Sequence, residues 1–264
     1  MTATVTFKEN KYNSYEGKYA GDVVIPETVT FEGLTYSVTR LGDDCFTGCS
    51  RLTSVTLPNS VTSLEDDCFA GCNSLERIEV DAANTVYDSR ENCNAIIHTS
   101  TNELVVGCKN SKIPNSVTSL GYHCFYACSG LTSITIPNSV TSLGYGCFNG
   151  CSSLISITIP NSVTSLGYGC FDGCSSLTSI TIPNSVTGLG QDCFRGCSSL
   201  TSITIPNSVT GLGRSCFSGC SSLTSITIPN SVTCLGGGLL QWLQQFDLHH
   251  YSQLCHEFWG DLLQ

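Results

Sequence analysis

The stretch LTSITIPNSVTGLGQDCFRGCSS, residues 177–199, returns almost unchanged at four other places in the chain. These copies begin at Leu131, Leu154, Leu200 and Leu223. A fixed period of this length is typical of a solenoid, in which each repeat buries its apolar face only by stacking on its neighbours. We therefore expect function to reside on a repetitive surface and not in a single pocket.

Each copy predicts two short strands and two corners. Ile180 and Ile182 alternate with polar residues, as in a strand with one buried face. Pro183 ends this strand because it has no N–H for the ladder, and residues 186–189 predict a second, shorter strand. The corner at residues 193–197 closes the coil. Stacked coils place equivalent residues about 4.8 Å apart, so Leu, Ile, Val, Phe and Cys should form internal columns and Ser and Thr external ones.

The pattern L-x-x-I-x-I-P-N-S-V-T-x-L-G-x-x-C-F-x-G-C resembles the BspA-like leucine-rich repeat family, the bacterial surface antigen type. The resemblance covers most of residues 22–238, with one departure: this chain has Cys where the family usually has Ala before the Phe. It implies a mainly β, right-handed solenoid, at the cell surface or secreted, from an anaerobic bacterium or a mucosal parasite. It also implies adhesion to host proteins as the usual role.

The composition agrees with such a protein and excludes other classes. Only 12% of the 264 residues are charged, and the formal net charge is −10. A nucleic-acid-binding surface needs clustered Lys and Arg, so we expect no nucleic-acid partner. No apolar run reaches the ~18 to 20 residues of a membrane span, and residues 1–20 lack the apolar core of a signal peptide. We expect no membrane insertion; the route of export stays open, with a cytosolic protein as the alternative.

Three parts follow one another along the chain. An N-terminal β cap is expected over residues 1–38, the solenoid over 39–238 and a non-repeat tail over 239–264. The cap covers the apolar end of the first coil. Glu32 and Gly33, between two alternating runs, predict a hairpin turn in this cap. The tyrosines of the cap are an alternative adhesive patch: Tyr12, Tyr15, Tyr19 and Tyr36.

The period breaks between Cys68 and Cys124, which lie two periods and ten residues apart. Within an irregular coil over about 75–112, two alternating runs at 95–98 and 103–107 flank a polar turn and predict an inserted β-hairpin. Insertions of solenoids usually form outside loops, so the hairpin is a candidate contact element. The alternative is a tolerated decoration. The candidate binding residues here are His98, Thr101 and Asn102.

The chain has 18 cysteines, most of which belong to repeated C-F-x-G-C or C-F-x-A-C corners. Their spacing is not that of a zinc ribbon and no His recurs beside them, so we expect no metal and no cofactor. Columns of buried free thiols are the simplest interpretation. The exception is Cys93 and Cys108, at the two feet of the hairpin, which we suggest as a disulfide.

No pattern of residues indicates an enzyme. His98 and His123 are the only histidines before residue 249, and neither recurs with Asp and Ser or Cys. Carboxylates precede the Cys-Phe corner on two successive coils, at 43–44 and 65–67. Stacked carboxylates can bind Ca²⁺, but a solvated charged surface is the competing interpretation.

Among the copies, the two residues before each Cys-Phe pair and the residue after it vary, whereas the Ser-x-Thr strand face does not. If the protein discriminates among partners, the variable corner is the candidate surface. A uniform Ser/Thr face favours weak, multivalent contact instead. The candidate binding residues of the corner are Tyr122, Tyr126, Tyr145, Asn149, Tyr168, Asp172, Gln191, Arg195 and Arg214.

The tail after Gly238 has a different composition, with both tryptophans and three of the five histidines of the chain. Apolar residues at helical spacing allow a helix over the open end of the stack. Read one base later, however, residues 244–253 can encode Ser-Ser-Leu-Thr-Ser-Ile-Thr-Ile-Pro-Asn. The tail is thus interpreted as the next repeat translated out of frame.

These observations together predict a non-enzymatic surface adhesion or recognition protein that binds host extracellular proteins or glycans. The alternative is a structural spacer or surface-layer element without a specific ligand. A Cys-based redox or metal-buffering protein is the third class. The oligomeric state stays open, and end-to-end association is one arrangement that open-ended coils allow.

Overall fold

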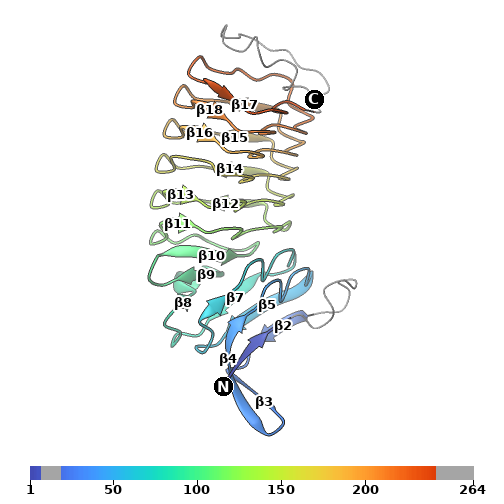
Figure 1. Cartoon of the computed structure of the whole chain (residues 1–264), viewed down its shortest axis with the longest axis vertical. Coiled ribbons are helices and arrows are strands. Elements are labelled where there is room, and N and C mark those ends of the chain that lie inside the picture. The colour runs from blue at the N-terminus through green and yellow to red at the C-terminus, as the bar shows by residue number, and fades with distance from the viewer. Residues whose placement is uncertain (7–18, 242–264) are drawn as a thin grey trace.

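The computed structural model describes residues 1–6 and 19–241, which are built almost entirely from short β-strands. Figure 1 shows an elongated stack of coils, with the strands as rungs. In the described residues the single helical element is the short 3-10 turn η1 (Arg90–Asn92). None of the helical structure described is long enough to cross a membrane. The predicted tail helix lies outside the described residues.

The first strand of each coil builds one side of the stack. These strands pair in parallel and in register, so that Ile157 lies beside Ile180 and Ile180 beside Ile203. Identical repeats therefore place like residues side by side. The strands form two sheets: β2 (Ala20–Val24), β5 (Arg51–Leu57) and β7 (Arg77–Val80); then β12 (Ser133–Thr135), β14 (Ser156–Thr158), β15 (Ser179–Thr181) and β17 (Ser202–Thr204).

The second strand of each coil builds the opposite side and is shorter than the sequence predicts. In the copy at 177–199, β16 holds only Gly188–Leu189 of the expected 186–189. Val186 is nevertheless fully buried, because it packs inward from the turn that follows Pro183. The other strands of this side are β6 (Ser63–Leu64), β11 (Ser119–Leu120), β13 (Ser142–Leu143), β18 (Gly211–Leu212) and β19 (Cys234–Leu235).

The N-terminal strands cover the first coil. β3 (Thr28–Phe31) and β4 (Leu34–Leu41) form the predicted antiparallel hairpin around Glu32 and Gly33, both of which have positive φ. β1 (Thr2–Val5) and β6 pair with β4 in parallel. Tyr19 packs against Phe46 at a ring distance of 4.9 Å, so it belongs to the core and not to an adhesive patch. Tyr12 and Tyr15 lie outside the described residues.

The inserted hairpin has the predicted strands, β9 (Ala95–His98) and β10 (Glu103–Gly107), paired antiparallel. Its position differs from the expected outside loop. β8 (Tyr87–Asp88) pairs with β9, and β10 pairs in parallel with β11, so the hairpin is a layer within the stack. Ile96 and Ile97 are fully buried. The hairpin joins two packed cores, and in Figure 1 it lies between the inclined N-terminal strands and the regular rungs.

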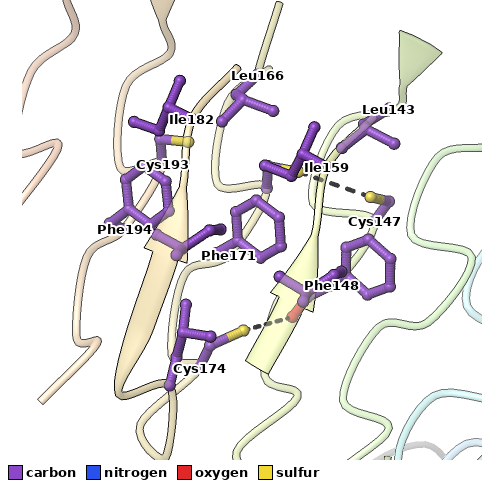
Figure 2. Packing of buried hydrophobic residues seen from close by; sticks show 14 of the residues in the cluster. Leu143, Cys147, Phe148, Ile159, Leu166, Phe171, Cys174, Ile182, Cys193 and Phe194 are labelled. Carbon is purple, nitrogen blue, oxygen red and sulfur yellow. Dashed lines mark hydrogen bonds between the residues drawn. The ribbon is translucent and has the colours of Figure 1, made fainter. Parts of the chain in front are cut away.

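Stacked phenylalanines form the centre of both cores. Figure 2 shows Phe148, Phe171 and Phe194 with their rings aligned, and successive centroids are 5.5 Å apart and nearly parallel. These rings have no exposed surface. The repeat thus produces a buried aromatic ladder, because a fixed period returns each Phe to the same corner.

The cysteines that the structure describes are free thiols, and all of them except Cys234 are buried. In the column before the Phe, the sulfurs of Cys147 and Cys170 lie 3.7 Å apart. In the second column five thiols donate a hydrogen bond to the Phe carbonyl of the previous coil, as Cys174 does to Phe148 at 3.2 Å (Figure 2); the other four are Cys72, Cys151, Cys197 and Cys220. This confirms the predicted buried thiol columns.

The suggested bridge between Cys93 and Cys108 is not formed. Cys93 belongs to the core of the regular coils, whereas Cys108 belongs to the N-terminal core. The Cys108 thiol donates a hydrogen bond to the Asn94 carbonyl oxygen at 3.3 Å. Cys93 and Cys108 lie at the same end of the hairpin, but their side chains belong to different cores.

Candidate functional site

The variable corners of successive coils align along one surface of the stack, which we call the corner surface. Its first column holds the residues that follow Leu-Gly, namely Tyr122, Tyr145, Tyr168, Gln191 and Arg214. A second column holds the residues that follow each Phe. Its members among the predicted binding residues are Tyr126, Asn149, Asp172 and Arg195.

Three tyrosines of the corner surface form an exposed ladder. The rings of Tyr122 and Tyr145 are stacked at 5.3 Å, and those of Tyr145 and Tyr168 at 4.5 Å. Their exposed fractions are 49%, 41% and 37%, in chain order. Both faces of the Tyr145 ring are covered by its neighbours, so the ladder presents ring edges and hydroxyl groups to solvent.

The hydroxyl group of Tyr168 interacts with the coil on each side of it. The carboxylate of Asp192 and the hydroxyl of Tyr145 hydrogen-bond to Tyr168 and raise the pKa of its hydroxyl to about 12. Gln191 also donates to Asp192, at 3.0 Å. The Tyr168 hydroxyl is therefore protonated at neutral pH and held between Tyr145 and Asp192.

Charge changes sign along the corner surface. Carboxylates lie at its N-terminal end, on the coils of Asp43 and Asp66, and arginines at the other end. Arg195 pairs with Asp172 at 3.7 Å while remaining half-exposed, and burial raises the pKa of Asp172 against the opposing effect of the guanidinium. A shallow depression brings together Gln191, Asp192, Arg195 and Arg214.

The predicted hairpin residues are not part of this surface. Thr101 and Asn102 precede β10, whereas Tyr122 follows the neighbouring strand β11. The two groups are thus at opposite ends of paired strands, roughly 15 Å apart for the five residues of β10. Asn102 accepts a hydrogen bond from Arg90 at 2.8 Å, and His98 contacts Ser100 and packs edge-on against Tyr87, so their side chains serve internal contacts.

The structure adds a cavity that the sequence analysis missed, at the joint between the two cores. We call it the joint cavity; its volume is about 190 Å³. Tyr122, His123 and Tyr126 are among its lining residues, and Nδ1 of His123 lies 2.8 Å from the Asp67 carboxylate. The available signal was the interrupted spacing of the Cys-Phe corners: the hairpin supplies strands to the stack but no corner.

The carboxylates considered for Ca²⁺ have other partners. Thr47 donates a hydrogen bond to Asp44, Arg40 pairs with Glu65 at 3.3 Å, and Asp67 contacts His123. Across residues 1–6 and 19–241 there is no group of three or more His, Cys, Asp or Glu side chains arranged to hold a metal ion.

The buried thiols are poorly suited to redox chemistry. Burial raises the pKa of Cys151 and Cys174 well above the usual range, with neighbouring thiols adding to the effect. The thiolate is the nucleophile in thiol chemistry, so a raised pKa lowers reactivity at neutral pH. The columns therefore act as packing elements.

Solved structures of bacterial repeat proteins share this fold. A leucine-rich repeat protein from Eubacterium ventriosum has a TM-score of 0.65 at 22% identity, over 88% of this chain and 66% of its own. A leucine-rich repeat protein from Bacteroides ovatus has a TM-score of 0.58 at 25% identity, over 93% of this chain and 67% of its own. The pneumococcal vaccine antigen PcpA has a TM-score of 0.63 at 19% identity, over 88% of this chain and 58% of its own. The chain thus spans about two thirds of the first two structures.

Sequence comparison identifies the repeat itself. No curated protein sequence matches. The model of the BspA type leucine rich repeat region matches six copies, over residues 27–105, 105–199 and 143–244. Leucine-rich repeat proteins are typically non-enzymatic scaffolds, and a repeat scaffold suits interaction with other proteins. Because the matches cover most of the chain, the protein belongs to the BspA-type leucine-rich repeat family.

Proposed function

We propose that this protein is a non-enzymatic recognition protein, at the cell surface or secreted, that binds a host extracellular protein through the corner surface. The observation that carries the proposal is the exposed ladder of Tyr122, Tyr145 and Tyr168. The ladder lies on the corner surface, where the residues beside each Cys-Phe pair differ from copy to copy. The likeness in fold between this chain and a pneumococcal vaccine antigen supports the proposed location at the cell surface or outside the cell.

The arrangement of the tyrosine rings favours a protein over a glycan as partner. A sugar stacks on the face of an aromatic ring, and both faces of Tyr145 are already covered. Ring edges and hydroxyl groups remain, which suit the apolar and hydrogen-bonding contacts of a protein interface. Tyrosine is enriched at the energetic centres of such interfaces because its rigid ring loses little entropy on binding.

Charge at the two ends of the corner surface adds a means of orienting the partner. The carboxylate end and the arginine end would favour a partner surface with the opposite polarity. Such rim charges affect association rate and salt dependence more than affinity. The tyrosine ladder between them would supply most of the binding energy.

Binding to immobilised matrix proteins, with immobilised glycans in parallel, tests the proposal. The variant replaces Tyr122, Tyr145 and Tyr168 by Ser; the copies themselves place Gln, Arg and Gly at this position, so the fold should tolerate the change. We expect affinity for the bound protein to fall at least about tenfold, since tyrosine hot spots contribute about 2 kcal/mol or more each.

The matched control replaces three residues of the uniform strand face, Thr135, Thr158 and Thr181, by Ser. These side chains are exposed and repeat in register like the tyrosines. Binding should be unchanged. Equal loss in both variants, binding to glycans alone, or no binding to any matrix protein would contradict the proposal, and the last result would favour a structural spacer.

A further inference from the structure

The joint cavity occupies the place of a missing corner. Between the coils that carry Phe69 and Phe125, the hairpin contributes strands but no Cys-Phe sequence, so the aromatic ladder is interrupted there. Phe69 stacks on Phe46 and Phe125 on Phe148; Gly107 lies under the Phe125 ring, where an added Cβ would meet ring carbons. Phe69 retains 8% exposure, whereas Phe148 has none.

The size of the cavity suits one aromatic ring with a short polar group. Its volume of about 190 Å³ exceeds the ~150 Å³ of an engineered apolar cavity that binds benzene. Phe69, Phe125, Val105 and Val106 give it an apolar wall. An aromatic ring placed on the cavity side of Phe69 would supply the second stacking partner that Phe148 and Phe171 have in the regular coils.

The polar part of the cavity is a row of backbone donors without partners. In a regular corner, three N–H groups donate to carbonyls of the next coil at 2.7–3.0 Å, from Gly146, Phe148 and Gly150. At the joint the equivalent groups form no such bond within residues 1–6 and 19–241; they belong to Asp67, Phe69 and Gly71, of which Asp67 and Phe69 line the cavity. Their backbone conformation is otherwise that of a regular corner, with positive φ at Asp67 and Gly71. They offer hydrogen bonds to a neutral acceptor.

The charged groups that line the cavity determine which sign of charge a ligand can carry. Four carboxylates line it, from Glu65, Asp66, Asp67 and Glu103, together with His123 and no Lys or Arg. Glu65 and Asp67 have ion-pair partners, Arg40 and His123. This surplus of carboxylate favours a cation and disfavours an anion at the mouth.

We propose that the joint cavity binds an aromatic amine that carries a neutral hydrogen-bond acceptor, as an aromatic amino-acid amide or the N-terminal aromatic residue of a peptide does. The ring packs on the cavity side of Phe69, and the carbonyl oxygen accepts from the Phe69 N–H. The ammonium group meets the carboxylates of Asp66 and Glu103. The proposal does not rest on partner binding at the corner surface, although Tyr122 and Tyr126 line both sites.

Calorimetric titration of the whole chain with four small probes tests each part of the proposal. Phenylalaninamide should bind. Alaninamide lacks the ring, N-acetylphenylalaninamide lacks the positive charge, and phenylalanine carries a carboxylate; each should bind at least about tenfold more weakly, a difference of about 1.4 kcal/mol. Equal affinity of phenylalaninamide and alaninamide would overturn the assignment.

Phenylalanyl-glycyl-glycinamide, added as a fifth probe, identifies the natural source of the group. Tighter binding than that of phenylalaninamide supports a peptide N-terminus, and weaker binding supports a free amide. Failure of both probes to bind would refute the site.

Two variants locate the site on the protein. Ala70→Tyr fills the cavity from its wall with the residue that the chain itself has at the equivalent position 126, and should abolish binding. Asp66→Asn should weaken binding about three- to fivefold, as expected for a partly solvated charge pair. Its matched control is Asp43→Asn, the equivalent residue one coil earlier, which does not line the cavity.

The outcomes remain decisive even if one variant is unstable. Unchanged binding by an Ala70→Tyr protein with normal circular dichroism and melting would overturn the proposal. If that variant does not fold, equal binding by Asp66→Asn and Asp43→Asn proteins would do so. Loss of phenylalaninamide binding without loss of matrix-protein binding would separate this site from the corner surface.

Discussion

The regular coils after Leu131 and the joint between the two cores are built from the same kinds of residue but differ in how these residues are paired. In the regular coils Phe148, Phe171 and Phe194 each have a ring on both sides, and each corner N–H has a carbonyl in the next coil. At the joint both ladders stop. The difference teaches that a repeat satisfies its own polar and aromatic groups only while the period holds.

The same difference appears in the thiol columns. Cys147, Cys151 and Cys174 have no exposed surface, whereas Cys72 and Cys128 beside the joint retain 5% and 7%. The interruption therefore exposes an interior that is closed elsewhere. Where the repeat period is interrupted, packing is less complete, and the same interruption leaves a cavity that a ligand can enter.

The largest expected effect is loss of stability at alkaline pH. Burial raises the pKa of the thiols of the regular coils, so they keep their protons when folded and lose them when unfolded above about pH 8.5. The unfolded state then binds fewer protons, and stability falls by up to about 1.4 kcal/mol per pH unit for each thiol. Urea midpoints measured from pH 7 to pH 10 should fall steeply.

The double variant Cys147→Ala with Cys193→Ala sharpens this result. It removes two of the fully buried thiols, so stability should fall less steeply with pH above pH 8.5. At pH 7 both thiols are protonated in either state, so any change in stability there comes from packing alone. A profile that is flat between pH 8 and pH 10 in the unmodified chain would show that the columns are oxidised or solvated, contrary to the structure.

The next effect compares one phenylalanine from each region. Phe171→Ala removes a ring that is stacked on both sides and should lower the free energy of unfolding by about 3–5 kcal/mol. Phe69→Ala removes a ring stacked on one side only, next to an existing cavity, and should cost about 2 kcal/mol. Urea unfolding of both variants measures the difference; equal losses would mean that the joint cavity is closed in solution.

Much of the fold is predictable because the repeat determines both the strand and the direction of each side chain. Ile180 and Phe194 are buried, as their positions in the repeat require, and one copy suffices to place the others. The stacking of Tyr122, Tyr145 and Tyr168 follows from the same register. The strands of the hairpin were also predictable, because alternation between 95 and 107 is clear.

The position of the hairpin and the joint cavity were not predictable in the same way. Whether an insertion lies outside a solenoid or becomes one of its layers depends on the burial of Ile96 and Ile97 on both sides, which alternation alone does not show. The separation of Cys93 from Cys108 has the same origin, since the layer directs them into different cores. The cavity results from a corner that is absent, and residues that are present give only an indirect indication of it.

The smallest expected effect is a difference in thiol labelling between the two regions of the folded protein. At pH 7.5 a maleimide should modify Cys72 and Cys128, which border the joint cavity, at least about tenfold faster than Cys151 and Cys174. Each of these four cysteines is the second of its corner, so the sites are matched in sequence context. Mass spectrometry of peptides at timed intervals measures the rates, and labelling in urea, where all four should react alike, is the control. Equal rates in the folded protein would mean that the regular coils open as readily as the joint. The two regions would then differ in structure but not in local stability.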